Sequence, residues 1–159
     1  MFSQTTEYAL RAMACLALKP GSLVSAGTLA EQTKVPSNYL AKVLQTLAQA
    51  GLIDGRRGVG GGYKLARPAS EINLLEVINA VSEVRRITTC PLGLTNHGPS
   101  LCPLHKRADA AAAAVIEIYG KSTLQNLLDD PKSNKPLCDE HATQQLTVSG
   151  RPKEPAGTR

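Results

Sequence analysis

The chain of 159 residues is predicted to be mainly α-helical with one small β-hairpin. Apolar residues recur at helical spacing in residues 37–50, and two short apolar runs flank a glycine-rich stretch within residues 52–65. A second helical pattern, rich in alanine, fills residues 103–119. No apolar run has the length of a membrane span and no signal-peptide layout is present, so we expect a soluble cytoplasmic protein.

The positive charge is concentrated in the first part of the chain. Residues 1–70 hold eight Lys and Arg against three acids, which accounts for the whole net charge of +5. Residues 71–128 and residues 129–159 each hold five basic and five acidic side chains. This distribution favours a polyanionic partner for the first part, although an ordinary solvated basic surface would look the same by charge alone.

Two helices are expected before the first apolar stripe. Residues 5–18 are apolar nearly all round, and Glu7 and Arg11 are four positions apart, which predicts an ion pair within that helix. A Lys-Pro-Gly sequence then breaks the helix, and Ser25 is placed to cap a second helix over residues 26–33.

The helix predicted from residue 37 has two distinct faces. Its buried face should carry Leu40, Val43, Leu44 and Leu47, at i, i+3, i+4 and i+7. The opposite face presents polar side chains that are long enough to reach a base edge or a phosphate. Gly51 follows, where a helix ends best on a residue that tolerates positive φ.

A β-hairpin is predicted directly after this helix, with strands near residues 52–53 and 63–65 and a basic, glycine-rich tip. Winged helix-turn-helix domains bind DNA with a helix followed by a basic hairpin. The helix lies in the major groove, and the hairpin contacts the backbone or the minor groove. The candidate DNA-binding residues are Ser37, Asn38, Tyr39, Lys42, Gln45, Arg56, Arg57 and Lys64.

Two further helices are predicted beyond the hairpin. Asn73 and Glu76 form a capping-box pattern for a helix over residues 74–83, which we expect to close the back of the winged domain. Ser122 is expected to cap a short helix that ends at residue 128, and residues 129–159 have the composition of a disordered tail.

The helix predicted over residues 103–119 has the spacing of a paired helix. Its apolar positions alternate by four and three residues, which is the heptad pattern of helix pairs. We call them the heptad residues: Leu104, Ala108, Ala111, Val115 and Ile118. A two-fold homodimer follows from this pattern and suits a reader of paired DNA half-sites; the alternative is packing on its own domain only.

The segment between these helices contains candidate metal ligands. Cys90 and Cys102 flank a loop without periodicity, and His105 follows Cys102 by one helical turn. Thiolate and imidazole are suited to iron or zinc. His97, Asn96 and Glu7 are candidates for the remaining positions, while Cys138 and His141 have metal-like spacing in the tail. The sequence therefore predicts that the chain is divided into four parts: a winged domain (1–84), a sensor loop (85–102), a dimerisation region (103–128) and a tail (129–159).

At these residues the chain resembles the IscR/NsrR family of bacterial transcription regulators, over about residues 1–130. The resemblance is carried by Thr6-Glu7-Tyr8-Ala9-Leu10-Arg11, by Ser37-Asn38-Tyr39-Leu40, and by Arg57-Gly58 with Gly60-Gly61-Gly62-Tyr63. It implies a winged-helix dimer, in many members with an iron–sulfur cluster. Members with clusters place three cysteines six residues apart in the loop.

Cys90 and Cys102 match the outer two of these cysteines, and the middle position is Asn96. His105 matches the histidine ligand of the IscR branch, and Glu7 matches the acidic position that reaches the cluster from the second subunit in the NsrR branch. The resemblance thus implies a cluster, of the two-iron–two-sulfur type, held by Cys90, Cys102, His105 and Glu7.

The sequence therefore predicts a dimeric, sequence-specific DNA-binding transcriptional regulator, acting as a repressor and controlled at the Cys90–Cys102 loop by a cluster, redox change or nitric oxide. Three alternatives stay open: a metal-free regulator with a thiol switch at Cys90 and Cys102, a thiol- or metal-dependent enzyme, and a protein–protein adaptor. No nucleophile–base pair is apparent, and the glycine run precedes a strand, whereas a phosphate-binding loop follows one.

Overall fold

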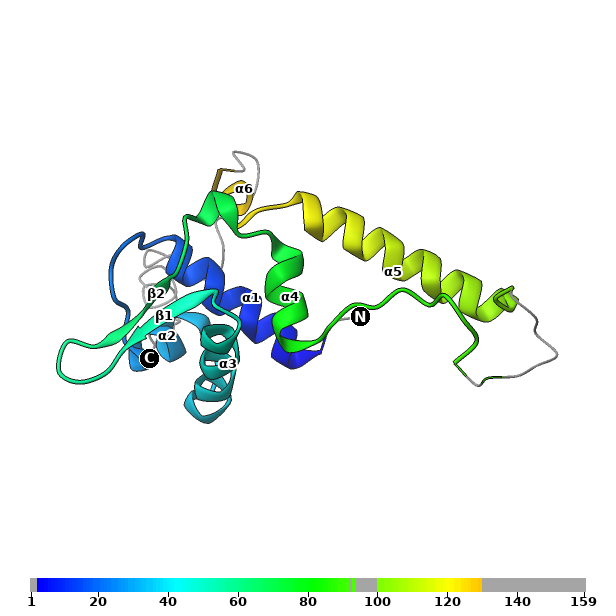
Figure 1. Ribbon diagram of the computed structural model, residues 1–159. Helices are drawn as coiled ribbons and strands as arrows, with labels where there is room; N and C mark the ends of the chain where they lie inside the picture. Colours follow the sequence, from blue (N-terminus) through cyan, green and yellow to red (C-terminus); the bar gives the residue numbers. More distant parts are fainter. Residues whose placement is uncertain (1–2, 92, 94–99, 130–159) are drawn as a thin grey trace, which may run out of the picture.

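The computed structural model describes residues 3–91, 93 and 100–129. The order of elements is α1 (Gln4–Ala17), α2 (Ala26–Thr33), α3 (Ser37–Gln49), β1 (Ile53–Arg56), β2 (Gly62–Leu65), the short 3₁₀ helix η1 (Ala69–Glu71), α4 (Leu74–Val81), α5 (Pro103–Lys121) and α6 (Leu124–Asp129). Helices α1 to α4 and the hairpin gather into one winged domain, from which α5 extends outward while α6 packs back against it (Figure 1). The predicted fold class is confirmed.

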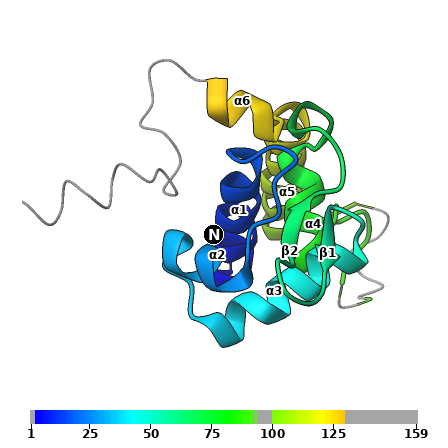
Figure 2. The same ribbon diagram turned by 90° about the vertical axis from the view of Figure 1, so that its left-hand side faces the viewer.

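Helix α1 lies at the centre of the winged domain, with α2, α3, α4 and α6 around it (Figures 1 and 2). Its buried residues include Ala9, Ala12 and Met13, which are fully shielded from solvent. Ser3 caps the helix by accepting a hydrogen bond from the Thr6 backbone N–H at 3.2 Å, so α1 begins one residue earlier than predicted. An aliphatic core without large aromatic side chains results, as the composition requires.

The helix-turn-helix unit consists of α2 and α3. Ser25 caps α2 as predicted, because its Oγ accepts from the Thr28 N–H at 3.1 Å. Lys34 then takes a left-handed conformation, with φ of 57°, and turns the chain into α3. All four members of the predicted stripe on α3 are buried, and Gly51 has the positive φ (69°) expected at the helix end.

Strands β1 and β2 form the antiparallel hairpin, which we call the wing, with Ile53 opposite Leu65 and Arg56 opposite Gly62. A third segment joins the wing at one residue: the N–H of Val24 donates to the Tyr63 carbonyl at 2.9 Å, and the Tyr63 N–H donates back at 2.8 Å. A side chain at Gly62 would lie only 2.5 Å from the Val24 carbonyl oxygen, so glycine permits this approach. Because Val24 alone pairs with the wing, the sequence around it shows no strand-like alternation of apolar and polar residues, and this contact was not predicted.

Helix α4 begins with the predicted capping box. The Glu76 N–H donates to Asn73 Oδ1 at 2.9 Å, and Glu76 Oε1 accepts from the Asn73 N–H at 3.1 Å. The helix ends at Val81, two residues short of the prediction, because Ser82 is extended and Asn79 Oδ1 accepts the Val84 N–H at 2.9 Å. The predicted buried stripe of this helix is Leu74, Val77, Ile78 and Val81; the first three are buried, whereas Val81, at the helix end, is half-buried.

The chain after α5 is attached to the winged domain through its backbone. The Leu74 N–H donates to the Ser122 carbonyl at 2.8 Å, and the Leu124 N–H donates to the Ile72 carbonyl at 2.9 Å. Leu124 is fully buried in the core. These contacts fix the point from which α5 leaves the domain.

The predicted cap of α6 at Ser122 is wrong. Ser122 Oγ donates instead to the Ile118 carbonyl at 2.9 Å, closing the end of α5. Thr123 and Asn126 perform the capping: Thr123 Oγ1 accepts from the Asn126 N–H, and Asn126 Oδ1 accepts from the Thr123 N–H. Because α5 continues to Lys121, two residues beyond the prediction, the hydroxyl at 122 belongs to the preceding helix. Asp129 closes α6, and residues 130–159 lie outside the described residues.

Candidate DNA-binding surface and candidate metal centre

Helix α3 presents the predicted polar face to solvent. Ser37, Asn38, Tyr39, Lys42 and Gln45 are all exposed, while the opposite face fills the core. The N-terminal end of α3 and the tip of the wing both project beyond the rest of the domain (Figure 1). The structure therefore brings the five helix candidates together on one exposed surface.

Tyr39 is supported by an aromatic neighbour that the sequence did not single out. The Tyr8 ring on α1 meets the Tyr39 ring edge-on, with centroids 6.4 Å apart and an interplanar angle of 61°. Tyr39 remains 55% exposed, so the contact orients the ring without removing it from solvent. Only the tertiary structure pairs these tyrosines, since they are 31 positions apart in the chain.

The three wing candidates are not equivalent. Arg56 ends β1 and Arg57 begins the tip, and both are exposed. Lys64 is half-buried on β2, opposite Asp54 in the register of the hairpin. The two arginines therefore provide the positive charge near the tip, while Lys64 lies nearer the body of the domain beside an acid.

The proposed metal ligands are only partly brought together. Cys102 is the residue before the first turn of α5, and its Sγ lies 3.3 Å from Nδ1 of His105. Cys90 is half-buried at the other end of the loop. Glu7 lies on α1, where its Oε1 accepts from Arg11 Nε at 3.0 Å, the ion pair that the spacing predicted.

Across residues 3–91, 93 and 100–129, no three His, Cys, Asp or Glu side chains gather into a metal-binding group. Asn96, His97, Cys138 and His141 lie outside the described residues. The convergence of a thiol and an imidazole at Cys102 and His105 nevertheless suits a soft or borderline metal. These two donors fit part of an iron–sulfur ligand set.

An ion pair holds the chain before the cysteine loop against α5. Arg86 donates to both carboxylate oxygens of Asp109, from Nε and from Nη2, each at 2.6 Å. The Ile87 N–H donates to Asp109 Oδ1 at 2.8 Å. The Arg86 side-chain hydrogen bond is the main cause that lowers the pKa of Asp109 to about 2, and the Ile87 N–H adds to it.

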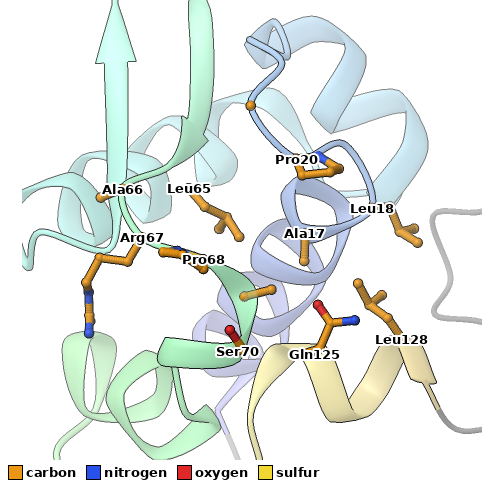
Figure 3. A pocket seen from close by; sticks show the side chains of 12 residues that line it. Ala17, Leu18, Pro20, Leu65, Ala66, Arg67, Pro68, Ser70, Gln125 and Leu128 are labelled. Atoms are coloured by element: carbon orange, nitrogen blue, oxygen red, sulfur yellow. The ribbon is translucent and has the colours of Figure 1, made fainter.

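A cavity of about 670 Å³ opens between the end of α1, the segment after β2 and α6. Gln125 and Leu128 of α6 face Ala17 and Leu18 across it, while Arg67 turns away toward α4 (Figure 3). Arg67 is occupied there, since its Nη2 donates to Glu76 Oε2 at 2.6 Å. The cavity lining is mainly aliphatic and no sequence pattern predicted it.

A helix-turn-helix with an exposed polar second helix and a basic wing defines a winged-helix DNA-binding protein. The chain belongs to the Rrf2 family, described as iron-dependent transcriptional regulators, whose family profile matches residues 2–130. The expected relationship to the IscR and NsrR regulators is thereby confirmed.

The chain is similar to the HTH-type transcriptional regulator NsrR of Bacillus subtilis, with 32% identity over 127 residues, covering 77% of this chain and 86% of that protein. It also resembles solved structures of CymR from Staphylococcus aureus (28% identity, TM-score 0.64, 82% of this chain and 100% of that one). IscR from T. potens shares the fold (24% identity, TM-score 0.68, 83% and 88%).

The protein is therefore a DNA-binding transcriptional regulator, and the alternative prediction of an enzyme is set aside because its family and relatives are regulators. Within the described part of the chain, no helix combines the length and apolar character that crossing a membrane requires.

Proposed function

We propose that the protein is a homodimeric, sequence-specific repressor whose DNA binding is controlled at the segment between Cys90 and His105. The observation that carries the proposal is the division of α3 into a buried aliphatic face and an exposed face with Asn38, Lys42 and Gln45. Amide side chains at such a position can read adenine, and lysine can read guanine or a phosphate. Bound at a promoter, such a dimer would block transcription.

The dimer is supported by the exposure of the heptad residues, of which only Val115 is half-buried. Leu104 is 71% exposed and Ile118 is 61% exposed, and no residue of α5 is buried in the single chain. A helix of 19 residues without a buried face would be unusual in a protein that remains monomeric. Pairing of two α5 helices would cover these side chains and set the spacing of two recognition helices.

Control by a two-iron–two-sulfur cluster is supported by Cys102 and His105, whose sulfur and nitrogen atoms already converge. Cys90 would provide a second thiolate, and Glu7 of the other copy a carboxylate. Such a cluster would supply sensitivity to oxidants and nitric oxide. A cluster on this segment would act on the orientation of α5 through the Arg86–Asp109 ion pair.

A metal-free thiol switch is the second candidate, favoured by two half-buried cysteines, Cys90 and Cys102, that flank the same loop. Oxidation of these thiols would report oxidants without a metal. One measurement distinguishes the cluster from the thiol switch: the absorbance of the purified protein, with its iron and sulfide content. Anaerobically purified protein with a cluster shows visible charge-transfer absorbance and equal amounts of iron and sulfide, whereas a thiol switch gives a colourless protein.

DNA binding is tested on a duplex selected by the protein from a random pool. The logarithm of the affinity should fall linearly with the logarithm of salt concentration, with a slope of about −0.9 for each phosphate neutralised. Lys42→Ala should weaken binding and reduce that slope by about 1 if it contacts a phosphate, or relax the sequence preference if it contacts a base. Lys121→Ala, at the C-terminal end of α5 and outside α3 and the wing, is the matched control and should change neither. Failure to select any sequence would refute the proposed function.

A further inference from the structure

Val59 is the most exposed large apolar side chain among the described residues. Its relative exposure is 107%, at the apex of the wing, whereas Leu104 and Ile118 belong to the heptad residues of α5. Gly58 and Gly60 on either side offer it no shielding. The protein therefore holds a branched aliphatic side chain fully in water at the point farthest along the wing.

The backbone of the wing tip gives this position a defined shape. Gly58 and Gly60 have φ of 92° and 73°, and the Gly61 N–H donates to the Gly58 carbonyl at 2.9 Å. A side chain at Gly61 would lie 2.3 Å from the Arg56 carbonyl oxygen. Between Arg57 and Tyr63, Val59 is thus the sole side chain on a turn that is otherwise only backbone.

We propose that Val59 enters the DNA minor groove and makes the wing select A·T over G·C base pairs at the position that it contacts. The minor groove is about 6 Å wide, which suits a turn made of backbone and one small side chain. Arg56 and Arg57 stand beside the tip and match the negative potential of a narrow A·T-rich groove.

The selectivity follows from the chemistry of valine. The minor-groove edge of a G·C pair carries the guanine 2-amino donor, which an A·T pair lacks. Valine has no acceptor for that donor and would cover it, so the donor would lose its bond to water. Against an A·T pair, the same methyl groups can lie on the deoxyribose and the groove floor without burying a hydrogen-bond donor.

This inference rests on the proposed function, since it needs a specific DNA complex. The probe is the duplex selected from a random pool, in which each A·T pair outside the α3 half-sites is replaced in turn by G·C and by inosine·C. Inosine lacks the 2-amino group, so an inosine·C pair has the minor-groove groups of A·T and the major-groove groups of G·C. At the pair under the wing, G·C should weaken binding about fivefold to tenfold and inosine·C should restore it.

The protein variant provides the second arm. Val59→Ala should weaken binding to the A·T probe about fivefold without changing the salt slope, because the lost contact is apolar, and should reduce the penalty for G·C. Arg57→Ala, in contrast, should lower the salt slope by about 1. Leu127→Ala, an exposed leucine on α6, is the control for apolar truncation and should bind as wild type.

Equal affinity of Val59→Ala and wild type would overturn the inference, as would a G·C penalty that inosine does not relieve. An unaltered Tm of each variant shows that folding is not the cause. If wild-type protein selects no duplex, the proposed function itself fails, and this result is distinct from a specific complex that is indifferent to Val59.

Discussion

Arg86 and Asp109 join the chain before the cysteine loop to helix α5 by two parallel hydrogen bonds of 2.6 Å each. Asp109 also accepts the Ile87 N–H, so side chain and backbone of the connecting segment are both held. Because Asp109 lies on α5 seven residues after Cys102, the contact fixes both ends of the cysteine loop relative to one helix.

Asp109→Asn should destabilise the protein in a pH-dependent way. The folded pKa of Asp109, about 2, lies below its ordinary value of about 3.9, so its contribution is fully present above about pH 4 and is lost as the pH falls toward 2. The difference in Tm between variant and wild type should therefore shrink over that interval, in thermal unfolding followed by circular dichroism. Glu83→Gln, in the exposed Glu83–Arg85 pair of the same segment, is the control and should give a small shift. A difference that stays constant down to pH 2.5 would contradict the role of the ion pair.

Glu76 is expected to stabilise the start of α4 in two separable ways. Its Oε1 accepts from Asn73, and its Oε2 accepts from Arg67 Nη2 at 2.6 Å. Glu76→Ala removes both and should cost about 1–2 kcal/mol of unfolding free energy. Glu76→Gln keeps the cap while removing the charge, and should cost clearly less in urea denaturation. Equal losses for the two variants would assign the whole effect to the Arg67 contact.

Ile118→Glu should prevent dimerisation. A charge on the exposed heptad face would have to be buried without a partner between two α5 helices, while the single chain would tolerate it in solvent. Light scattering after size-exclusion chromatography should then give a monomer where wild type gives a dimer, with α-helical content unchanged. Leu127→Glu on α6 is the matched control and should remain dimeric. A dimeric Ile118→Glu protein would place the interface elsewhere.

Loss of Cys102 or His105 should lower iron content. Cys102→Ala and His105→Ala each remove one of two donors that lie 3.3 Å apart, and anaerobically reconstituted protein should lose most of its visible absorbance and bound iron. Cys15→Ala is the control, because Cys15 is buried on α1 and donates to Gln32 Oε1. Wild-type iron and sulfide in both ligand variants would remove this pair from the site.

Gly61→Ala should disable the wing without unfolding the domain. A Cβ there would lie 2.3 Å from the Arg56 carbonyl oxygen and 2.8 Å from that of Gly58, so the tip must move. We expect at least tenfold weaker binding to the selected duplex, about 1.4 kcal/mol, with a nearly unchanged Tm. Gly27→Ala, whose nearest neighbour would be 3.8 Å away, is the control and should bind normally. Normal binding by Gly61→Ala would show that the wing does not contact DNA.

Much of the local structure could be predicted because it depends on short-range chemistry. The stripe on α3, the cap at Ser25 and the capping box at Asn73 each involve residues within about two turns of one another, and all three are observed. The cap at Ser122 failed for a related reason. A serine at this position can either cap the start of α6 or donate its hydroxyl to a carbonyl at the end of α5. The length of α5 decides between the two, and Ser122 donates to the Ile118 carbonyl of α5.

The sequence by itself determined the order of the helices, the buried face of α3, the basic wing and the family, since periodicity, glycine placement and motif residues are all local properties. Tertiary structure decided which distant groups meet: Tyr8 with Tyr39, Val24 with Tyr63, and Arg86 with Asp109. It also left Val59 fully exposed at the tip of the wing. Contacts between residues far apart in the chain depend on how whole elements pack, and a single sequence carries no periodic signal for them.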